Sequence, residues 1–563
     1  MRTSRAGLVA AVSVLVVATA PAAATTPDPL APYRGQQVAW GACPFKQRAQ
    51  PPQAECARIT VPRDWAAPSA GTDLQVAISR VRATGTRQGA ILVNPGGPGG
   101  RGTALAGALA GLQPSVNEHY DIVGMDPRGT GQEGGTDPGY VCRVPLGRLP
   151  ADDNLDARDR SAASIALHQR TPRVLAEACQ SDALAPFITT WQTAHDMDLI
   201  RTLLGDEKLN YLGFSYGTWL GAKYASLFPD RAGKLVLDSS VNFEGRLQAA
   251  FEAFPKIDQR QFDRVYAPWL ARRFPEQLGR TATEVRAKWE RLRVFFKDQG
   301  VPPDVFDSVF VGNGSTRQWL TGALILTKGA AALDGKATPP PAALRGDLDR
   351  ASRAVFGRPA DRLTAADVAA DPPEPDYADV PGTRLAVACG DQPTRTATWY
   401  KLLSDLQGPA YPLFGWAYGL SEACGFWSDL PRNELPRLSP RAAKNILVVQ
   451  GEFDPQTGYE QAEAGARAAG IPMISVADSP FHGQYAVSGN SCVDKLVNGF
   501  FLGAARPAAT ICPGVPLPGE REVHPVPGPA GEPSQPATPA SRDADSPVRE
   551  RLQDDISAVN RGR

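Results

Sequence analysis

Short apolar segments separated by turn-forming residues recur along the chain, and they carry the main information about its fold. They are rich in β-branched side chains and contain few polar positions, which is typical of strands covered on both faces, as in a parallel sheet. We expect a buried strand at each of these segments. They occupy residues 89–93, 120–125, 209–214, 234–237, 446–449 and 473–476.

Helical patterns lie between several of these strands. Residues 190–204 repeat apolar side chains every three or four positions, and Gly205 ends the helix that this repeat predicts. Strands that alternate with helices pair in parallel and are joined by right-handed crossovers. The sequence therefore predicts an α/β fold with a mostly parallel central sheet.

The alternation of strands and helices disappears between residues 242 and 440. Residues 283–297 predict an amphipathic helix in this interval, and a stretch rich in Pro and Ala follows near residues 337–375. Because the strand pattern resumes at Ile446, we interpret the interval as a mainly helical cap inserted between two strands of one sheet. The predicted organisation is a first part of the core at residues 25–241, the cap at 242–440 and a second part of the core at 441–514.

Both ends of the chain differ in composition from the rest. Arg2 and Arg5 precede an apolar run that ends in alanines at 22–24, so residues 1–24 predict a signal peptide for Sec-type export. That run is too short to span a bilayer, and no membrane anchor is expected. Residues 515–563 are rich in Pro and small residues and predict a disordered tail, because they bury too little apolar surface to offset their ordering entropy.

The overall composition narrows the range of functions. Of the 563 residues, 42% are hydrophobic, and 59 Lys and Arg balance 59 Asp and Glu, so the formal net charge is zero. A nucleic-acid-binding protein needs a basic excess to displace counterions from phosphates, so no such partner is expected. We expect a soluble, secreted protein that works as a monomer.

In an exported chain, the eight cysteines favour structural disulfides over metal or redox chemistry. No two of them have CxxC spacing, and the five histidines are too scattered for a zinc site, so no metal is expected. Many pairings are possible, and we favour sequence neighbours because each such pair closes a local loop. The favoured pairs are Cys43 with Cys56, Cys142 with Cys179, Cys389 with Cys424, and Cys492 with Cys512.

The clearest catalytic motif is Gly213-Phe-Ser215-Tyr-Gly217, which directly follows a predicted strand and precedes a helix. A Gly-x-Ser-x-Gly sequence in this setting is a nucleophile elbow. The turn is so tight that side chains at the two glycine positions would collide with neighbouring backbone. It also places the serine hydroxyl at a helix N-terminus, where developing negative charge is stabilised. Ser215 is therefore the predicted nucleophile.

A serine nucleophile needs a base and an acid that orients the base. His482 lies in a loop just after the last predicted strand, where this architecture presents its base. Asp454 follows the strand at 446–449 in a Gly-x-x-Asp-Pro turn and is the predicted acid, with Glu452 as the alternative. The chain order of serine, acid and histidine is that of the α/β-hydrolases.

A glycine-rich loop, Asn94-Pro-Gly-Gly97-Pro-Gly-Gly100, follows the strand at 89–93. Its glycines allow backbone N–H groups to approach a tetrahedral oxyanion, and it lacks the lysine of a phosphate-binding loop. We predict the N–H groups of Gly97 and Tyr216 as the oxyanion donors. One strand later, a charged turn at residues 126–131 is expected to support this loop.

Together these motifs resemble the secreted tripeptidyl aminopeptidase family of actinobacteria, which are α/β-hydrolases related to the prolyl aminopeptidases. The resemblance covers roughly residues 35–515. It rests on the loop at 94–100, the turn at 126–131, the elbow at 213–218 and the segments around Asp454 and His482.

The resemblance implies serine-dependent release of short peptides from substrates with a free N-terminus, without a metal or cofactor. By analogy, Ser215, Asp454 and His482 form the catalytic triad. The segments that begin at Cys389 and Cys424 are similar to cysteine-bearing segments of the family, which supports a disulfide between them.

An aminopeptidase has to hold a protonated amine at a fixed distance from its serine. Asp391 is the candidate carboxylate, and a turn aspartate without this role is the alternative. Trp416 and Trp427 are candidates for lining the substrate pocket, with packing of the cap as the alternative. A triad does not determine the acyl substrate, so an esterase, a lactonase or another small-molecule hydrolase is the alternative function. The complete set of catalytic motifs disfavours an inactive binding protein.

Overall fold

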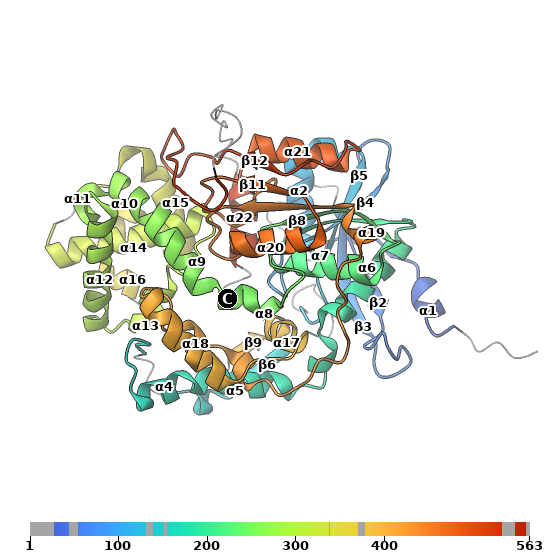
Figure 1. Cartoon of the computed structure of the whole chain (residues 1–563), viewed down its shortest axis with the longest axis horizontal. Coiled ribbons are helices and arrows are strands. Elements are labelled where there is room, and N and C mark those ends of the chain that lie inside the picture. The colour runs from blue at the N-terminus through green and yellow to red at the C-terminus, as the bar shows by residue number, and fades with distance from the viewer. Residues whose placement is uncertain are drawn as a thin grey trace, which may run out of the picture.

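A ten-stranded sheet forms the centre of the protein in the computed structural model (Figure 1). The structure describes residues 28–43, 54–130, 139–150, 155–336, 338–369, 378–531 and 547–558. The strand order is β1-β2-β3-β5-β4-β7-β8-β10-β11-β12, in which β1, β2 and β3 are antiparallel and β5 to β12 run parallel. The strands are β1 Gly41–Ala42, β2 Ala54–Val61, β3 Leu74–Val81, β4 Gly89–Asn94, β5 Tyr120–Met125, β7 Leu209–Phe214, β8 Ala232–Asp238, β10 Ile446–Gly451, β11 Met473–Val476 and β12 Thr510–Cys512.

All six predicted strands are present, and the predicted α/β class is confirmed. Strand β4 shows why the pattern was continuous: Ala90 and Leu92 pack into one core cluster, whereas Ile91 and Val93 pack into a second cluster across the sheet. The antiparallel strands β1 to β3 were not predicted. Strands β2 and β3 mix polar with apolar positions, so they lack the continuous apolar signal of the buried strands.

Helices cover both faces of the sheet and thereby bury the two clusters. Helices α6, α7 and α20 lie on one face, and α2 and α21 lie on the other (Figure 1). The helix predicted at 190–204 corresponds to α6. The bounds are α1 Ala31–Arg34, α2 Thr103–Leu112, α3 Pro114–Asn117, α6 Thr190–Leu203, α7 Tyr216–Leu227, α19 Pro440–Ala443, α20 Tyr459–Ala469 and α21 Ser491–Phe501.

The segment between β8 and β10 is mainly helical and has a core of its own, in which Trp269, Trp289 and Trp319 are fully buried. The helix predicted at 283–297 is α12, which begins with a capping box between Thr281 and Glu284. The helices are α8 Leu247–Glu252, α9 Phe254–Gln261, α10 Ala267–Arg273, α11 Pro275–Leu278, α12 Ala282–Asp298, α13 Pro303–Ser308, α14 Thr316–Asp334, α15 Arg345–Phe356, α16 Ala365–Ala369, α17 Thr383–Gly390 and α18 Ala397–Ala410.

A segment of the first core part joins this helical region, which the predicted division at residue 242 did not anticipate. Strand β6 (Val141–Val144) pairs with β9 (Ala378–Pro381), and α5 packs against the chain near Phe426. The two helices of this segment are α4 Ala162–His168 and α5 Arg170–Gln180. The cap therefore consists of the inserted residues together with a strap from the first part of the chain.

All four favoured disulfides are formed, and each closes a loop of 13 to 37 residues. They pair Cys43 with Cys56, Cys142 with Cys179, Cys389 with Cys424, and Cys492 with Cys512. Of the helices that the structure describes, none is long and apolar enough to cross a membrane.

The prediction of a disordered tail at 515–563 is wrong for the residues that the structure describes. Residues 547–558 form helix α22 (Pro547–Ala558), in which Leu552 and Ile556 are buried four positions apart on one side. The average composition of the tail concealed this short amphipathic pattern. The rest of the tail beyond residue 531 and the signal peptide predicted at 1–24 lie outside the described residues.

Candidate active site

The chain makes a strained turn at Ser215, between β7 and α7. Ser215 has φ 58° and ψ −126°, a conformation that L-residues adopt at a cost and that a tight strand-to-helix turn imposes. A Cβ on Gly213 would lie 2.5 Å from the Gly217 carbonyl oxygen, and a Cβ on Gly217 would lie 2.9 Å from Asn94 Oδ1. The two glycines of the motif therefore have the steric role that the sequence predicted.

The glycine-rich loop after β4 packs directly on this turn. A Cβ on Gly96 would lie 2.8 Å from Ser215 Cβ and 3.2 Å from the backbone nitrogen of Tyr216. Asn94 shapes the loop by accepting a hydrogen bond from the Gly96 N–H at 2.9 Å. The loop that carries Gly97 thus lies beside the nucleophile elbow, as an oxyanion loop has to.

The charged turn after β5 holds the far end of the same loop. Asp126 Oδ1 accepts hydrogen bonds from the Thr103 N–H at 3.0 Å and the Thr103 hydroxyl at 2.8 Å, at the first residue of α2. Arg128 is fully buried and forms an ion pair with Asp196 at 2.6 Å. Asp126 therefore fixes the start of α2, just after the oxyanion loop, whereas Arg128 joins its turn to α6.

Asp454 and His482 come together at the carboxyl edge of the sheet. His482 Nδ1 lies 3.0 and 2.9 Å from the two carboxylate oxygens of Asp454, and both side chains are fully buried. The Asp454 carboxylate also accepts hydrogen bonds from the N–H groups of Gln456 (2.8 Å) and Thr457 (3.0 Å) and from the Thr457 hydroxyl (3.0 Å). These donors fix the carboxylate so that it orients the imidazole.

Glu452, the alternative acid, has other partners. Its carboxylate accepts hydrogen bonds from the N–H groups of Asp478 and Ala530, both at 2.8 Å. It therefore anchors the loop after β11 to the segment near residue 530.

Asp238, at the end of β8, connects the nucleophile elbow to the histidine loop, and the sequence analysis missed it. Its backbone carbonyl accepts a hydrogen bond from the Ser215 N–H at 3.0 Å. Its carboxylate accepts hydrogen bonds from the N–H groups of Gln484 (3.0 Å) and Tyr485 (2.7 Å), which follow His482. Its place at the end of a strand beside the elbow was the signal that could have identified it.

We expect Asp238 to make the folded state less stable as the pH rises from about 4 to about 8. Burial, and then the neighbouring Asp454, raises the pKa of Asp238 from 3.8 to about 8. The folded state therefore binds this proton over a window in which the unfolded chain has released it, so the free energy of unfolding falls with pH. Thermal unfolding should show a smaller decrease in Tm over this window for Asp238→Asn than for the wild type.

The exposed Asp230 provides the matched control, because Asp230→Asn removes a carboxylate from the surface. Identical pH dependence of Tm in Asp238→Asn and the wild type would contradict the assignment to Asp238.

A cavity of about 940 Å³ lies between the cap and the carboxyl edge of the sheet. Pro95 and Gly99 of the oxyanion loop form part of its wall, as do Pro455 and Gln456 next to Asp454. Its size suits a bound oligopeptide or drug-sized ligand. Near the predicted Trp416, the residues that line the cavity include Phe414, Tyr418 and Glu422.

The predicted substrate-binding residues Asp391, Trp416 and Trp427 are not among the residues that line this cavity. The Asp391 carboxylate is buried and accepts hydrogen bonds from the Thr190 N–H (2.8 Å) and Trp219 Nε1 (3.2 Å). Asp391 is therefore a structural aspartate, which was the alternative to its predicted role of binding the substrate amine. Trp427 is buried in the main core, and Trp416 packs under the Arg160 guanidinium at 5.3 Å.

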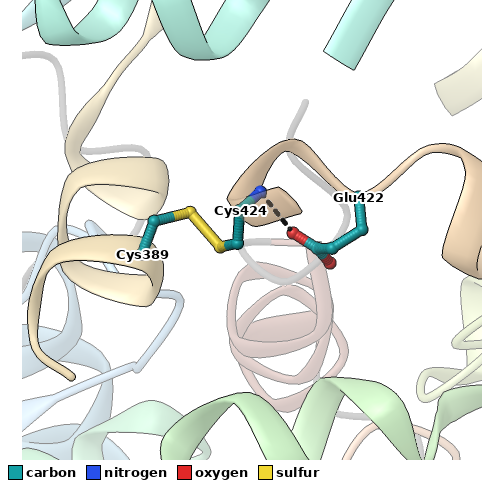
Figure 2. Close-up of side chains that lie close together, drawn as sticks. All are labelled: Cys389, Glu422 and Cys424. Atoms are coloured by element: carbon teal, nitrogen blue, oxygen red, sulfur yellow. Dashed lines mark hydrogen bonds between the residues drawn. A yellow bond between two sulfur atoms is a disulfide. The ribbon is translucent and has the colours of Figure 1, made fainter. Parts of the chain in front are cut away.

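Glu422 is a carboxylate of the cavity wall that the sequence analysis did not identify. It lies beside the disulfide between Cys389 and Cys424 (Figure 2). Its Oε1 accepts a hydrogen bond from the Cys424 N–H at 3.1 Å, and its Oε2 accepts one from the Tyr418 hydroxyl at 2.9 Å. Burial raises the pKa of Glu422.

A metal is disfavoured at this cluster, although a carboxylate and two sulfur atoms lie within 4.8 Å of one another. Both sulfurs belong to the disulfide, so neither is available as a thiolate ligand. No local sequence signal marks Glu422, because only the fold of the cap brings it to the cavity.

The fold, the strained strand-to-helix turn at Ser215 and the hydrogen-bonded pair of Asp454 and His482 are typical of a serine hydrolase with an α/β-hydrolase architecture. A family profile described as the alpha/beta hydrolase fold matches residues 89–478. The chain therefore belongs to the α/β-hydrolase family.

Known relatives narrow the class further. The tripeptidyl aminopeptidase of Streptomyces coelicolor is 30% identical over 481 residues, which cover 80% of this chain and 81% of the relative. Serine protease Hip1 of Mycobacterium tuberculosis is 28% identical, with 84% and 91% covered. Carboxylesterase B of the same organism is 29% identical, with 87% and 92% covered. The predicted resemblance to the tripeptidyl aminopeptidases is confirmed, and the chain is a serine hydrolase related to them.

Proposed function

We propose that the protein is a secreted serine exopeptidase that releases short peptides, preferentially tripeptides, from substrates with a free N-terminus. The observation that carries this proposal is the hydrogen-bonded pair of Asp454 and His482 beside the strained elbow at Ser215 and next to a walled cavity. The 30% identity to a tripeptidyl aminopeptidase supports a peptide as the substrate.

The reaction follows from the hydrogen bonds at the site. With its Nδ1–H donated to Asp454, His482 has the lone pair of its neutral imidazole on Nε2, which takes the proton of the Ser215 hydroxyl. Ser215 Oγ then bonds to the substrate carbonyl carbon, and the N–H groups of Gly97 and Tyr216 receive the oxyanion.

Collapse of the tetrahedral intermediate breaks the peptide bond. His482 gives its proton to the leaving amine, and the N-terminal part of the substrate stays on Ser215 as an ester. Water, deprotonated by His482, hydrolyses this ester and regenerates the serine hydroxyl. The chemistry is complete with these side chains.

We propose that Glu422, and not Asp391, is the carboxylate that binds the protonated amine of the substrate. Glu422 is half-buried and lines the same cavity as the oxyanion loop. The hydrogen bonds from Tyr418 and Cys424 hold its carboxylate in place. A protonated amine bound there would form a charge-assisted hydrogen bond and would favour the ionised form of Glu422.

A second candidate function is the hydrolysis of small-molecule esters. Two observations favour it: the 29% identity to Carboxylesterase B, and the apolar side chains of Phe254, Leu413 and Phe414 in the cavity wall. These apolar groups would hold an uncharged acyl chain as well as they hold a peptide side chain.

The test compares peptide–chromophore substrates of increasing length, each free and N-acetylated, together with simple esters. We expect cleavage confined to free-amine substrates, with the highest kcat/KM for the tripeptide. We expect Glu422→Gln to lower kcat/KM for free-amine substrates by roughly 10- to 100-fold, as the loss of a hydrogen bond to a charged group of about 1.5–3 kcal/mol predicts.

The control is Glu434→Gln, which removes an exposed carboxylate in the segment after Glu422 and should leave kcat/KM unchanged. Hydrolysis of simple esters without peptide cleavage would establish the esterase. Equal cleavage of free and acetylated peptides would contradict the role of the amine.

Export is part of the proposal. The four disulfides support it, because such bonds persist in oxidising compartments outside the cytosol. The signal peptide predicted at residues 1–24 would direct the chain there.

A further inference from the structure

Helix α22 lies between the cap and the core (Figure 1). It contacts α14 of the cap and α2 of the core. Helix α2 begins directly after the oxyanion loop, and the chain just before α14 contacts His482, whose N–H donates a hydrogen bond to the Gly314 carbonyl at 2.8 Å. The C-terminal helix thus occupies the seam at which the cap meets the active site.

The apolar side of α22 packs next to the histidine loop. Leu552 and Ile556 are buried in the core cluster that also contains Phe214, the residue before Ser215. A Cβ on Gly483, which follows His482, would lie 3.8 Å from Ile556 Cγ2. The end of α22 therefore lies against Gly483, the residue that follows the proposed base His482.

Polar contacts hold the same end of the helix. The carbonyl of Ser557 accepts a hydrogen bond from Gln456 Nε2 at 3.0 Å, and the Gln456 N–H donates to Asp454. Asp554 Oδ1 accepts a hydrogen bond from the Ser315 hydroxyl at 2.6 Å, and Asp554 also pairs with Arg317. Each of these partners belongs to the cap or to the active-site loops, so α22 bridges the two.

The proposed nucleophile and base are buried. Ser215 is only 3% exposed and His482 is fully buried, and neither is among the residues that line the cavity of about 940 Å³, whose wall comes close to them at Pro95 and Gln456. Leu552, Asp555 and Ala558 of α22 form part of the cavity wall. A peptide cleaved at Ser215 extends in two directions, and the cavity has room for its N-terminal part. The part beyond the cleaved bond needs an exit.

We propose that α22 is a built-in cover, which occupies the path of the C-terminal part of a peptide substrate and has to leave before long peptides are cleaved. This proposal rests on the proposed role of Ser215. Helix α22 is held by two buried apolar side chains, by a few hydrogen bonds and by the ion pairs of Asp554 with Arg317, Glu550 with Arg350 and Arg549 with Asp494, a set that a competing peptide can replace. A protein that is mostly covered reacts more slowly in proportion to its uncovered fraction.

The test releases α22 after folding. The recognition sequence of a site-specific protease is inserted after Gly531, which is exposed, and the folded protein is cut. The readout is the second-order rate constant for labelling of Ser215 by a fluorophosphonate with a long peptide-like substituent. We expect this rate constant to rise by about tenfold or more after the cut, and a synthetic peptide of residues 547–563 to reverse the rise.

A substitution provides an independent arm. Ile556→Glu places a charge in a fully buried position and should displace α22, with the same rise in the labelling rate. The matched control is Leu430→Glu, because the Leu430 side chain is 79% exposed.

Each outcome decides the matter. Equal labelling before and after the cut overturns the cover and leaves the proposed function intact. Slower labelling after the cut also overturns it and makes α22 a part that assembles the site. If Ser215 is not labelled in either form, the proposed function fails, and the cover fails with it.

Discussion

Ser215→Ala is expected to lower kcat for free-amine peptides by about a millionfold. Without Oγ no acyl-enzyme forms, and the oxyanion loop and His482 retain only a weak effect on the attack of water. The change removes one oxygen from a residue whose backbone geometry depends on the neighbouring glycines, so the fold should be retained. The measurement is steady-state hydrolysis of the preferred peptide–chromophore, with circular dichroism as the check on folding.

The control for this substitution is Ser181→Ala, which removes a hydroxyl from an exposed residue at the end of α5 and should leave kcat unchanged. Undiminished turnover in Ser215→Ala would show that another group is the nucleophile. Loss of fluorophosphonate labelling in the same variant would identify the labelled atom.

Asp454→Asn is expected to lower kcat by about ten-thousandfold. An asparagine in this position presents an N–H to His482 Nδ1, so the imidazole places its proton on Nε2, where it cannot accept the proton of Ser215. The Asp and Asn side chains are close in shape. The one oxygen of the Asn side chain can still accept the hydrogen bonds from the N–H groups of Gln456 and Thr457.

The chain offers a matched control two residues away. Glu452→Gln changes a carboxylate whose hydrogen-bond partners are the N–H groups of Asp478 and Ala530, so kcat should stay within a few-fold of the wild type. If the large effect appeared in Glu452→Gln and not in Asp454→Asn, the acid of the triad would be Glu452.

The local structure that the sequence predicted around the proposed site depends on neighbours along the chain. The turn at Ser215 is imposed by Gly213 and Gly217, and its strain is visible in the backbone angles. The choice of Asp454 over Glu452 rested on the Gly-x-x-Asp-Pro turn that follows β10, and the structure places Asp454 and not Glu452 against His482. In each case the sequence signal lies in a short stretch of chain, although the contact of Asp454 with His482 joins residues that are 28 positions apart.

The residues that line the cavity, in contrast, could not be predicted from their neighbours along the chain. The sequence analysis selected Trp416 and Trp427 in the cap, but the residues of this segment that line the cavity include Phe414, Tyr418 and Glu422 and neither tryptophan. Short turns of 3-10 helix and the disulfide between Cys389 and Cys424 set the direction of each side chain there. Such orientation has no periodic pattern from which it could be predicted.

Local sequence was sufficient for the alternation of strands and helices, the elbow at Ser215, the glycine-rich loop and the four disulfides. Each of these depends on residues that are close in sequence or on a strong apolar pattern. Three-dimensional packing was required to show Asp238 bridging the elbow and the histidine loop, Glu422 in the cavity wall, and α22 between the cap and the active-site loops. These contacts join segments that are far apart along the chain, and their energies arise only when the cap, the sheet and the C-terminal helix are brought together.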